Sequence, residues 1–281
     1  MNNIIGGNEA ALEAAALAFV KTQSEQNVTY VEVRYDPERA ARSSYVDGNA
    51  SIPLESAVHA IQRGLARGQE LKPPVAAYQL LCAMRDKPLS QCYSVAELAS
   101  SLRSDEPGGV VGMDLAGNEW TRHSKTSQFV PCFRHAKFDL GLNTTIHVGE
   151  TLPWPLRSHT EQDVWIAAVE MGVDRIGHGY AMSLSSATVN TTIADAVRSR
   201  GIHLEACPYT AEGEGSIKAI GVFRDLNFSF GINTDDPCIG CSSAPRSIAA
   251  DEALLRNKLG FEDANFEAAY REARKHAFAK V

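Results

Sequence analysis

The chain alternates short β-rich runs with helical stretches, and this alternation restricts the fold more than any other feature of the sequence. Seven runs have the composition of strands: residues 28–35, 75–84, 110–117, 143–150, 174–179, 202–208 and 228–235. A first helix is expected over 9–26, and further helices between the runs, for example over 160–172 and 188–201. Parallel strands need a crossover connection, which is usually a helix, so the pattern predicts an α/β protein with a parallel sheet.

Polar residues or glycines stand at the carboxyl end of nearly every predicted strand. They are Arg34, Arg85, Asp114 with Gly117, His147 with Glu150, His178, Glu205, and Asp235 with Asp236. A (β/α)8 barrel of the TIM type concentrates its chemistry at that end of its strands, and we therefore predict such a barrel. Seven runs do not close it, so we expect the first strand to be missing from this chain.

Size and charge narrow the possible partners. The 281 residues are 44% hydrophobic, which suffices for one barrel or for two ordinary domains. A formal charge of −7 and the lack of a basic stripe argue against nucleic acid and anionic membranes as partners, and no apolar run is long enough to predict a membrane span. The first residues lack a secretory signal, which favours a cytoplasmic protein. Secretion stays open, because the missing strand puts this N-terminus in question.

The six cysteines do not form the dense framework of a small secreted domain. They stand at Cys82, Cys92, Cys132, Cys207, Cys238 and Cys241. We expect most of them to be reduced. The close pair in "CIGC", Cys238 and Cys241, has redox or metal spacing, but without a second pair we expect no function for it.

Three motifs carry the residues with chemistry: "TIHVGE" with His147 and Glu150, "RIGHGY" with His178, and "NTDDP" with Asp235 and Asp236. Each alone favours a structural interpretation, since a histidine at a strand end is more often a satisfied polar residue and "NTDDP" is typical of a turn. Together, they fall on one rim of the predicted barrel. Imidazole and carboxylate ligands around an open coordination position are what a catalytic zinc ion needs.

The motifs occur in a familiar order along almost the whole chain. They are "YVEVRYDP", "CAMR", "VVGMDLAGNE", "TIHVGE", "DRIGHGY", "CPYT" and "NTDDP". In this order and at these intervals the chain resembles the adenosine deaminase family of zinc hydrolases. The resemblance implies a single barrel domain over residues 1–281, incomplete at both ends.

The resemblance also implies roles for individual residues. His147 and Asp235 correspond to zinc ligands, with one zinc ion per chain. Glu150 corresponds to the proton donor to purine N1, and His178 to the base or orienting partner of the attacking hydroxide. Asp236 corresponds to a hydrogen-bond partner that orients the hydroxide and the purine.

Other positions have smaller implied roles or none. Gly117 corresponds to a close backbone contact to the base, and Asp114 is expected to support the loop that holds it. Glu32 and Arg34 are expected to form structural ion pairs. No motif covers the remaining histidines, which we expect at the surface or in packing: His59, His123, His135, His159, His203 and His276.

One part of the family pattern has no counterpart. The first barrel strand of the family carries a His-x-His pair that supplies two zinc ligands, whereas no two histidines here are separated by a single residue. We expect those two ligands upstream of Met1, and the chain as given to bind zinc poorly. Strands 28–35 and 228–235 would then expose pairing edges. A truncated gene product, a processed fragment, a degenerate copy and a strand borrowed from another chain all remain open.

The function that follows is zinc-dependent hydrolysis of adenosine or 2'-deoxyadenosine to inosine or 2'-deoxyinosine and ammonia, in purine metabolism. The alternatives are a deaminase of adenine, AMP or an N6-substituted nucleotide, and a catalytically degenerate descendant that binds a purine or a protein partner. The expected ligand is a purine nucleoside. A monomer or a weak oligomer is expected.

Overall fold

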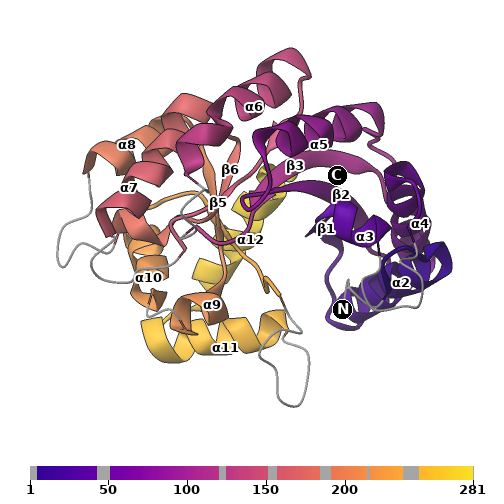
Figure 1. Ribbon diagram of the computed structural model, residues 1–281. Coiled ribbons are helices and arrows are strands. Elements are labelled where there is room, and N and C mark those ends of the chain that lie inside the picture. The colour runs from indigo at the N-terminus through magenta and orange to yellow at the C-terminus, as the bar shows by residue number, and fades with distance from the viewer. Residues whose placement is uncertain are drawn as a thin grey trace. The chain divides into compact units, whose positions relative to one another are not determined.

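The computed structural model describes residues 5–42, 51–119, 125–150, 157–183, 191–213, 216–236 and 247–280 (Figure 1). By their contacts, these residues form two compact units. Unit 1 comprises Met1–Ala116, Ala136–Asn143 and Phe278–Lys280, and unit 2 comprises Gly117–His135 and Thr144–Ala277. Each unit is described by itself below.

A parallel sheet forms the centre of unit 1. Its strands are β1 (Tyr30–Tyr35), β2 (Ala76–Met84), β3 (Val110–Ala116) and β4 (Asn143–Thr144), in the order β1-β2-β3-β4. β1 and β3 both pair with β2 in parallel. The register of the β2–β3 pairing shifts between Gln79 and Leu80. Most of β2 is buried, as is usual for a strand covered on both faces by helices and neighbours.

Helices α2 and α4 pack against each other in unit 1. The helices of this unit are α2 (Glu9–Glu25), α3 (Pro37–Ala41), α4 (Leu54–Ala66) and α5 (Leu89–Ser101), with a 3-10 turn at Arg67–Glu70 and a π-helical turn at His135–Asp139 where the units meet in sequence. Asn8 caps α2 by accepting a hydrogen bond from the backbone N–H of Ala11. Gly64 permits the close approach, because a Cβ there would lie 2.3 Å from the carbonyl oxygen of Glu13.

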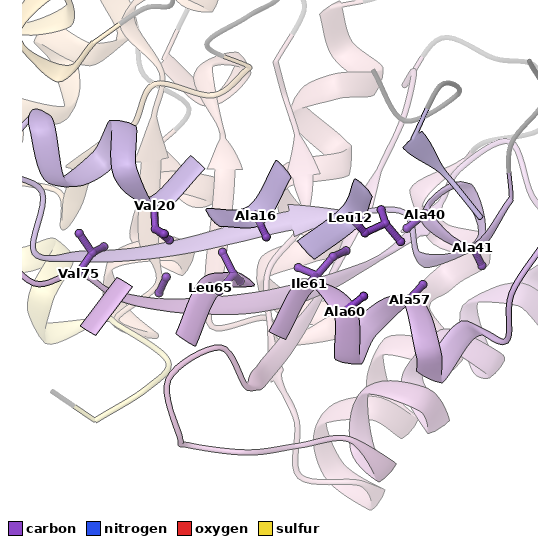
Figure 2. Close-up of a cluster of buried hydrophobic side chains, with 11 residues drawn as sticks. Leu12, Ala16, Val20, Ala40, Ala41, Ala57, Ala60, Ile61, Leu65 and Val75 are labelled. Carbon is purple, nitrogen blue, oxygen red and sulfur yellow. The ribbon is translucent and has the colours of Figure 1, made fainter. Parts of the chain in front are cut away.

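Small and branched side chains fill the core between these helices and the sheet. Figure 2 shows the cluster, in which α2 and α4 face each other. Its labelled members are Leu12, Ala16, Val20, Ala40, Ala41, Ala57, Ala60, Ile61, Leu65 and Val75. Ala16 is the buried alanine of α2, and its small side chain lies where Gly64 of α4 approaches.

A second parallel sheet forms the centre of unit 2. Its strands are β5 (His147–Val148), β6 (Arg175–His178), β7 (His203–Ala206) and β8 (Phe230–Ile232), in the order β5-β6-β7-β8. All three pairings are parallel, with His147 opposite Gly177, Gly177 opposite Glu205, and Leu204 opposite Phe230. The carboxyl ends of these strands therefore lie along one edge.

Helices connect and cover the strands of unit 2. They are α6 (Val130–Arg134), α7 (Arg157–Trp165), α8 (Thr191–Ser199), α9 (Pro208–Gly213), α10 (Ile217–Asp225), α11 (Ile248–Leu259) and α12 (Asp263–Lys275). 3-10 turns lie at Thr126–Phe129 and Tyr180–Ser183, and α7 continues as a π-helix over Ile166–Met171. α12 packs on β8, and α9 packs against both α10 and α11 (Figure 1).

The predicted α/β class with parallel strands is confirmed. Each of the seven predicted runs contains a strand, and the run 143–150 contains two short ones, β4 and β5. The helix expected over 9–26 is α2. The predictions of a single domain and of a missing first strand stay predictions. Among the described residues, no helix combines the length and apolar character that a membrane crossing requires.

The expectation that most of the six cysteines are reduced stays a prediction, because the structure describes four of them and these divide equally. Cys92 in α5 and Cys132 in α6 are disulfide-bonded and fully buried, while Cys82 and Cys207 are free thiols. Spacing along the chain does not show which side chains a fold brings together, so disulfide bonding of Cys92 and Cys132 could not be predicted from the sequence. Cys238 and Cys241 lie outside the described residues.

Candidate active site

The turn after β5 presents Glu150. Gly149 has a φ of +68°, and a Cβ there would lie 2.9 Å from Val164, so this tight turn requires glycine. The Glu119 carboxylate accepts hydrogen bonds from the backbone N–H groups of Gly149 at 2.7 Å and Glu150 at 3.1 Å. Sequence reasoning missed Glu119, although it ends the quoted motif "VVGMDLAGNE".

Two of the predicted site residues have a left-handed backbone. His178 has a φ of +68° and Asp235 a φ of +56°. Among the described residues, the other non-glycine positions with positive φ are Asn27 and Asn227, and asparagine tolerates this conformation well. A histidine held this way is uncommon, and such strain clusters at functional sites. The fold therefore maintains an uncommon backbone conformation at His178, whereas aspartate tolerates the conformation of Asp235.

Imidazoles and carboxylates from three strand ends converge in unit 2. The Nε2 atom of His178 lies 3.8 Å from Oε2 of Glu150 and 4.0 Å from Oδ2 of Asp235. The rings of His147 and His178 have centroids 5.4 Å apart. The His178 side chain is 1% exposed, whereas those of Glu150 and Asp235 are 30% and 21% exposed. The group thus combines a buried imidazole with carboxylates that solvent or a ligand can reach.

Neighbouring hydroxyl groups hold two members of this group. Thr210 donates a hydrogen bond from Oγ1 to Oδ2 of Asp235 at 2.8 Å. The Tyr180 hydroxyl lies 3.5 Å from Nδ1 of His178, accepts from the backbone N–H of Cys207 at 2.7 Å and donates to its carbonyl oxygen at 3.2 Å. Burial raises the pKa of Tyr180 well above its usual value, so the phenol stays protonated.

A buried ion pair lies beneath the site. The Arg175 Nε atom is 2.8 Å from Oε1 of Glu205, and both side chains are almost fully buried. Thr145 donates to the same carboxylate oxygen at 3.2 Å. Glu205, one of the polar residues noted at strand ends, is therefore engaged between β6 and β7.

Gly117 and Asp236 also belong to unit 2, and both are exposed. Gly117 has a φ of +106°, which a residue with a side chain rarely adopts. Asp236 directly follows Asp235 at the end of the described segment 216–236. The roles assigned to these two residues in substrate binding stay predictions.

Polar residues at the strand ends of unit 1 form structural contacts. Arg34 Nη1 lies 3.6 Å from Oδ2 of the fully buried Asp114. Glu32 accepts a hydrogen bond from the backbone N–H of Phe278 at 2.7 Å. These contacts agree with the structural interpretation of Glu32 and Arg34.

Two of the histidines without a motif pack together in unit 2. The rings of His203 and His276 are stacked, with centroids 4.8 Å apart and planes inclined by 15°. Nδ1 of His203 lies 2.9 Å from Oγ of Ser229. Burial, and after it the neighbouring His276, lower the pKa of His203 to about 3, so His203 is neutral near pH 7. His203 serves packing, as expected from the sequence.

The donor atoms at the site fit a divalent metal ion. Imidazole nitrogen and carboxylate oxygen are ligands that zinc accepts, and four residues carry them: His147, Glu150, His178 and Asp235. Among the described residues, a group that could hold a metal ion is His178, Cys207 and Asp235, whose donor atoms all lie within 4.8 Å of one another. The predicted ligand pair, His147 and Asp235, shares His178 as a neighbour.

Parallel strands whose carboxyl ends gather imidazoles and carboxylates define a class, the metal-dependent hydrolases of α/β-barrel fold. The family model described as adenosine deaminase matches residues 1–281. The chain therefore belongs to the adenosine deaminase family, whose members are metal-dependent hydrolytic enzymes.

Individual relatives agree with this assignment. Adenosine deaminase from Xenopus tropicalis is 28% identical, over 98% of this chain and 74% of its own length. The structure of N6-methyl-AMP deaminase from Arabidopsis thaliana matches with a TM-score of 0.75 and 23% identity, over 97% of this chain and 75% of that one. An amidohydrolase from Burkholderia ambifaria with bound Zn matches with a TM-score of 0.77 and 20% identity, over 96% of this chain and 69% of that one. These likenesses confirm the predicted fold class.

Proposed function

We propose that the protein hydrolyses the 6-amino group of adenosine or 2'-deoxyadenosine, giving inosine or 2'-deoxyinosine and ammonia. One observation carries the proposal: His147, Glu150, His178 and Asp235 converge at the strand ends of unit 2, and two of them sit on a left-handed backbone. Such strain persists only where the surrounding structure enforces it. Membership of the adenosine deaminase family supports the same reaction.

Glu150 is the proposed proton donor. Its side chain is 30% exposed, so a planar base can reach it, and the Glu119 carboxylate fixes the turn that presents it. A proton delivered to purine N1 withdraws electrons from C6 and prepares that carbon for attack by water. The carboxylate left on Glu150 then lies 3.8 Å from Nε2 of His178, a separation that a small side-chain shift closes to a hydrogen bond.

His178 is the proposed base that takes a proton from the attacking water. Its Nε2 atom lies between the carboxylates of Glu150 and Asp235, at 3.8 and 4.0 Å, and both favour the protonated ring once it has formed. The Tyr180 hydroxyl lies beside Nδ1, the other ring nitrogen, and orients the ring. A water placed between His178 and the base would then lose its proton as it adds to C6.

The metal is the proposed cofactor, as one zinc ion per chain. His147 and Asp235 would hold it, with Thr210 fixing the Asp235 carboxylate at 2.8 Å. When bound, zinc supplies a Lewis acid that lowers the pKa of water to about 7. Two ligands are fewer than a zinc site needs, so other donors would have to complete the coordination.

Asp236 and Gly117 are the proposed contacts to the purine. Asp236 follows a metal ligand directly and is exposed, which suits a carboxylate that orients both the water and the base. Gly117, with no side chain and an exposed backbone, suits a close approach to the ring. The proposed ligand is thus a purine nucleoside, and we propose a cytoplasmic protein, with secretion as the alternative.

A nucleotide is the second candidate substrate. The likeness to the N6-methyl-AMP deaminase of Arabidopsis, at 23% identity, keeps this possibility in view, because the two folds agree over almost the whole chain. Discrimination between a nucleoside and its monophosphate needs a cationic pocket for the phosphate. A substrate panel therefore decides between them.

The test measures deamination by the purified chain with zinc added, on adenosine, 2'-deoxyadenosine, AMP, N6-methyl-AMP and adenine. We expect turnover of adenosine and deoxyadenosine, abolished by His147→Ala and by a metal chelator. The matched control is His59→Ala, because His59 is an exposed histidine of α4 that contacts Gln62. Faster deamination of AMP or N6-methyl-AMP than of adenosine would indicate that the substrate is a nucleotide and not a nucleoside. Purine binding without turnover by folded protein would favour a non-catalytic descendant.

A further inference from the structure

A free thiol lies among the proposed catalytic residues. Cys207 directly follows β7 and precedes α9, and its side chain is buried at 6% exposure. Its Sγ atom, one nitrogen of His178 and one carboxylate oxygen of Asp235 all lie within 4.8 Å of one another. The reaction proposed above gives this thiol no role.

The three donor atoms are close enough to share one ion. When no pair is more than 4.8 Å apart, some point lies within about 2.8 Å of all three atoms. Zinc takes sulfur at about 2.3 Å and nitrogen or oxygen at about 2.0–2.2 Å, so side-chain movements of under about 1 Å would complete the contacts. The 4.0 Å between Nε2 of His178 and Oδ2 of Asp235 leaves room for an ion between them.

The backbone at Cys207 is fixed in place. The Tyr180 hydroxyl bonds both the N–H and the carbonyl of Cys207, and the same hydroxyl lies 3.5 Å from the His178 ring. Thr210, one helical turn further along the chain, bonds Asp235. Hydroxyl groups thus contact His178, the backbone of Cys207 and the Asp235 carboxylate, while Sγ of Cys207 lies 3.7 Å from the carbonyl oxygen of Glu205.

We propose that Cys207 is a metal ligand, which holds a thiophilic divalent cation together with His178 and Asp235. On binding, the Cys207 thiol releases its proton to solvent and the thiolate donates an electron pair to the cation. A thiolate, imidazole and carboxylate set selects zinc, cobalt or cadmium over magnesium or calcium. This inference rests on the proposed function only in that both use His178 and Asp235.

An ion at this position would oppose catalysis. It takes the His178 nitrogen that the proposed reaction needs as a base, so a cation held by Cys207 excludes that proton transfer. The structure thus provides a position where excess zinc or cadmium inhibits the enzyme. The inhibition arises in the site itself and requires no second pocket.

The test uses cobalt without substrate. Metal-free protein is titrated with Co²⁺, and a sulfur-to-cobalt charge-transfer band in the near ultraviolet reports thiolate ligation. We expect Cys207→Ser to remove the band and to weaken cobalt binding by at least about tenfold, since loss of residues that merely support ligands already weakens binding about 10- to 100-fold. The matched control is Cys82→Ser, which removes the other free buried thiol of the described residues and should retain the band.

A second variant assigns the band without altering Cys207. The triple variant Cys82→Ser, Cys238→Ser, Cys241→Ser keeps Cys207 and, besides it, only Cys92 and Cys132, which are disulfide-bonded in the unmodified chain. A thiol titration of the unfolded variant checks that Cys207 is its one free thiol. A band in this variant supports the proposal even if Cys207→Ser fails to fold. Cobalt binding without the band, or a band that survives Cys207→Ser, would overturn it. Neither result depends on deamination, so this proposal and the proposed function can fail separately.

Discussion

At the scale of single residues, Glu119 shows how a site depends on a side chain that does no chemistry itself. Its carboxylate accepts both backbone N–H groups of the Gly149–Glu150 turn. Charge-assisted bonds of this kind are stronger than neutral ones. Glu119 therefore positions the turn that presents Glu150, and we propose that it would act on the substrate through that side chain.

Glu119→Gln should lower kcat by roughly 10- to 100-fold, because small misplacements of a reacting group have effects of this size. An amide offers one acceptor where the carboxylate offers two, so one N–H of the turn loses its partner. KM and the thermal midpoint should change little, and Glu119→Asp should recover part of the rate. Glu267→Gln, at an exposed position of α12, is the control. An equal fall in thermal stability and rate would indicate a structural role instead.

The sequence led to His147, Glu150, His178 and Asp235, and the structure brings these four together. Each of their motifs is a short continuous stretch of the chain, so it can be recognised in a single sequence. The supporting residues were missed for the opposite reason. Glu119, Tyr180 and Thr210 each contact a partner on another segment or across a turn, and no spacing along the chain encodes those contacts.

At the scale of elements, the alternation of strands and helices could be read almost fully from the sequence, since burial on both faces leaves a continuous apolar run. The break between β4 and β5 was missed. It falls at Thr145 and Ile146, where Thr145 turns its hydroxyl toward Glu205. A β-rich run does not reveal such a side-chain contact in advance.

The contact between α2 and α4 gives a prediction at this scale. Gly64→Ala should lower the free energy of unfolding by about 1–3 kcal/mol, because the new methyl group would lie 2.3 Å from the Glu13 carbonyl oxygen and 2.6 Å from Cβ of Ala16. Both are parts of a packed helix that can yield only by moving. Gly213→Ala is the control, since a Cβ there meets nothing within 4 Å. Chemical denaturation measures both, and equal midpoints would contradict the packing argument.

At the scale of the whole molecule, stability should depend on pH through His203. Burial and the neighbouring His276 lower its pKa in the folded protein to about 3, whereas an unfolded histidine has a pKa of about 6.5. Between these values the unfolded chain binds a proton that the folded chain excludes. His203 therefore contributes its full stabilisation above about pH 6.5 and loses it progressively as the pH falls toward 3.

The groups around His203 explain why the folded protein disfavours the protonated, charged form of its ring. The stacked His276 and the nearby Arg175 cation both lower the pKa of His203, and Glu205 raises it. A difference of about 3.5 pKa units corresponds to about 5 kcal/mol, of which relaxation and water entry would recover part. His203→Gln should flatten the fall in unfolding free energy between pH 6.5 and 4, measured by denaturation at each pH. The exposed His59→Gln should leave the slope unchanged, and an equally steep fall in His203→Gln would mean that other groups govern acid unfolding.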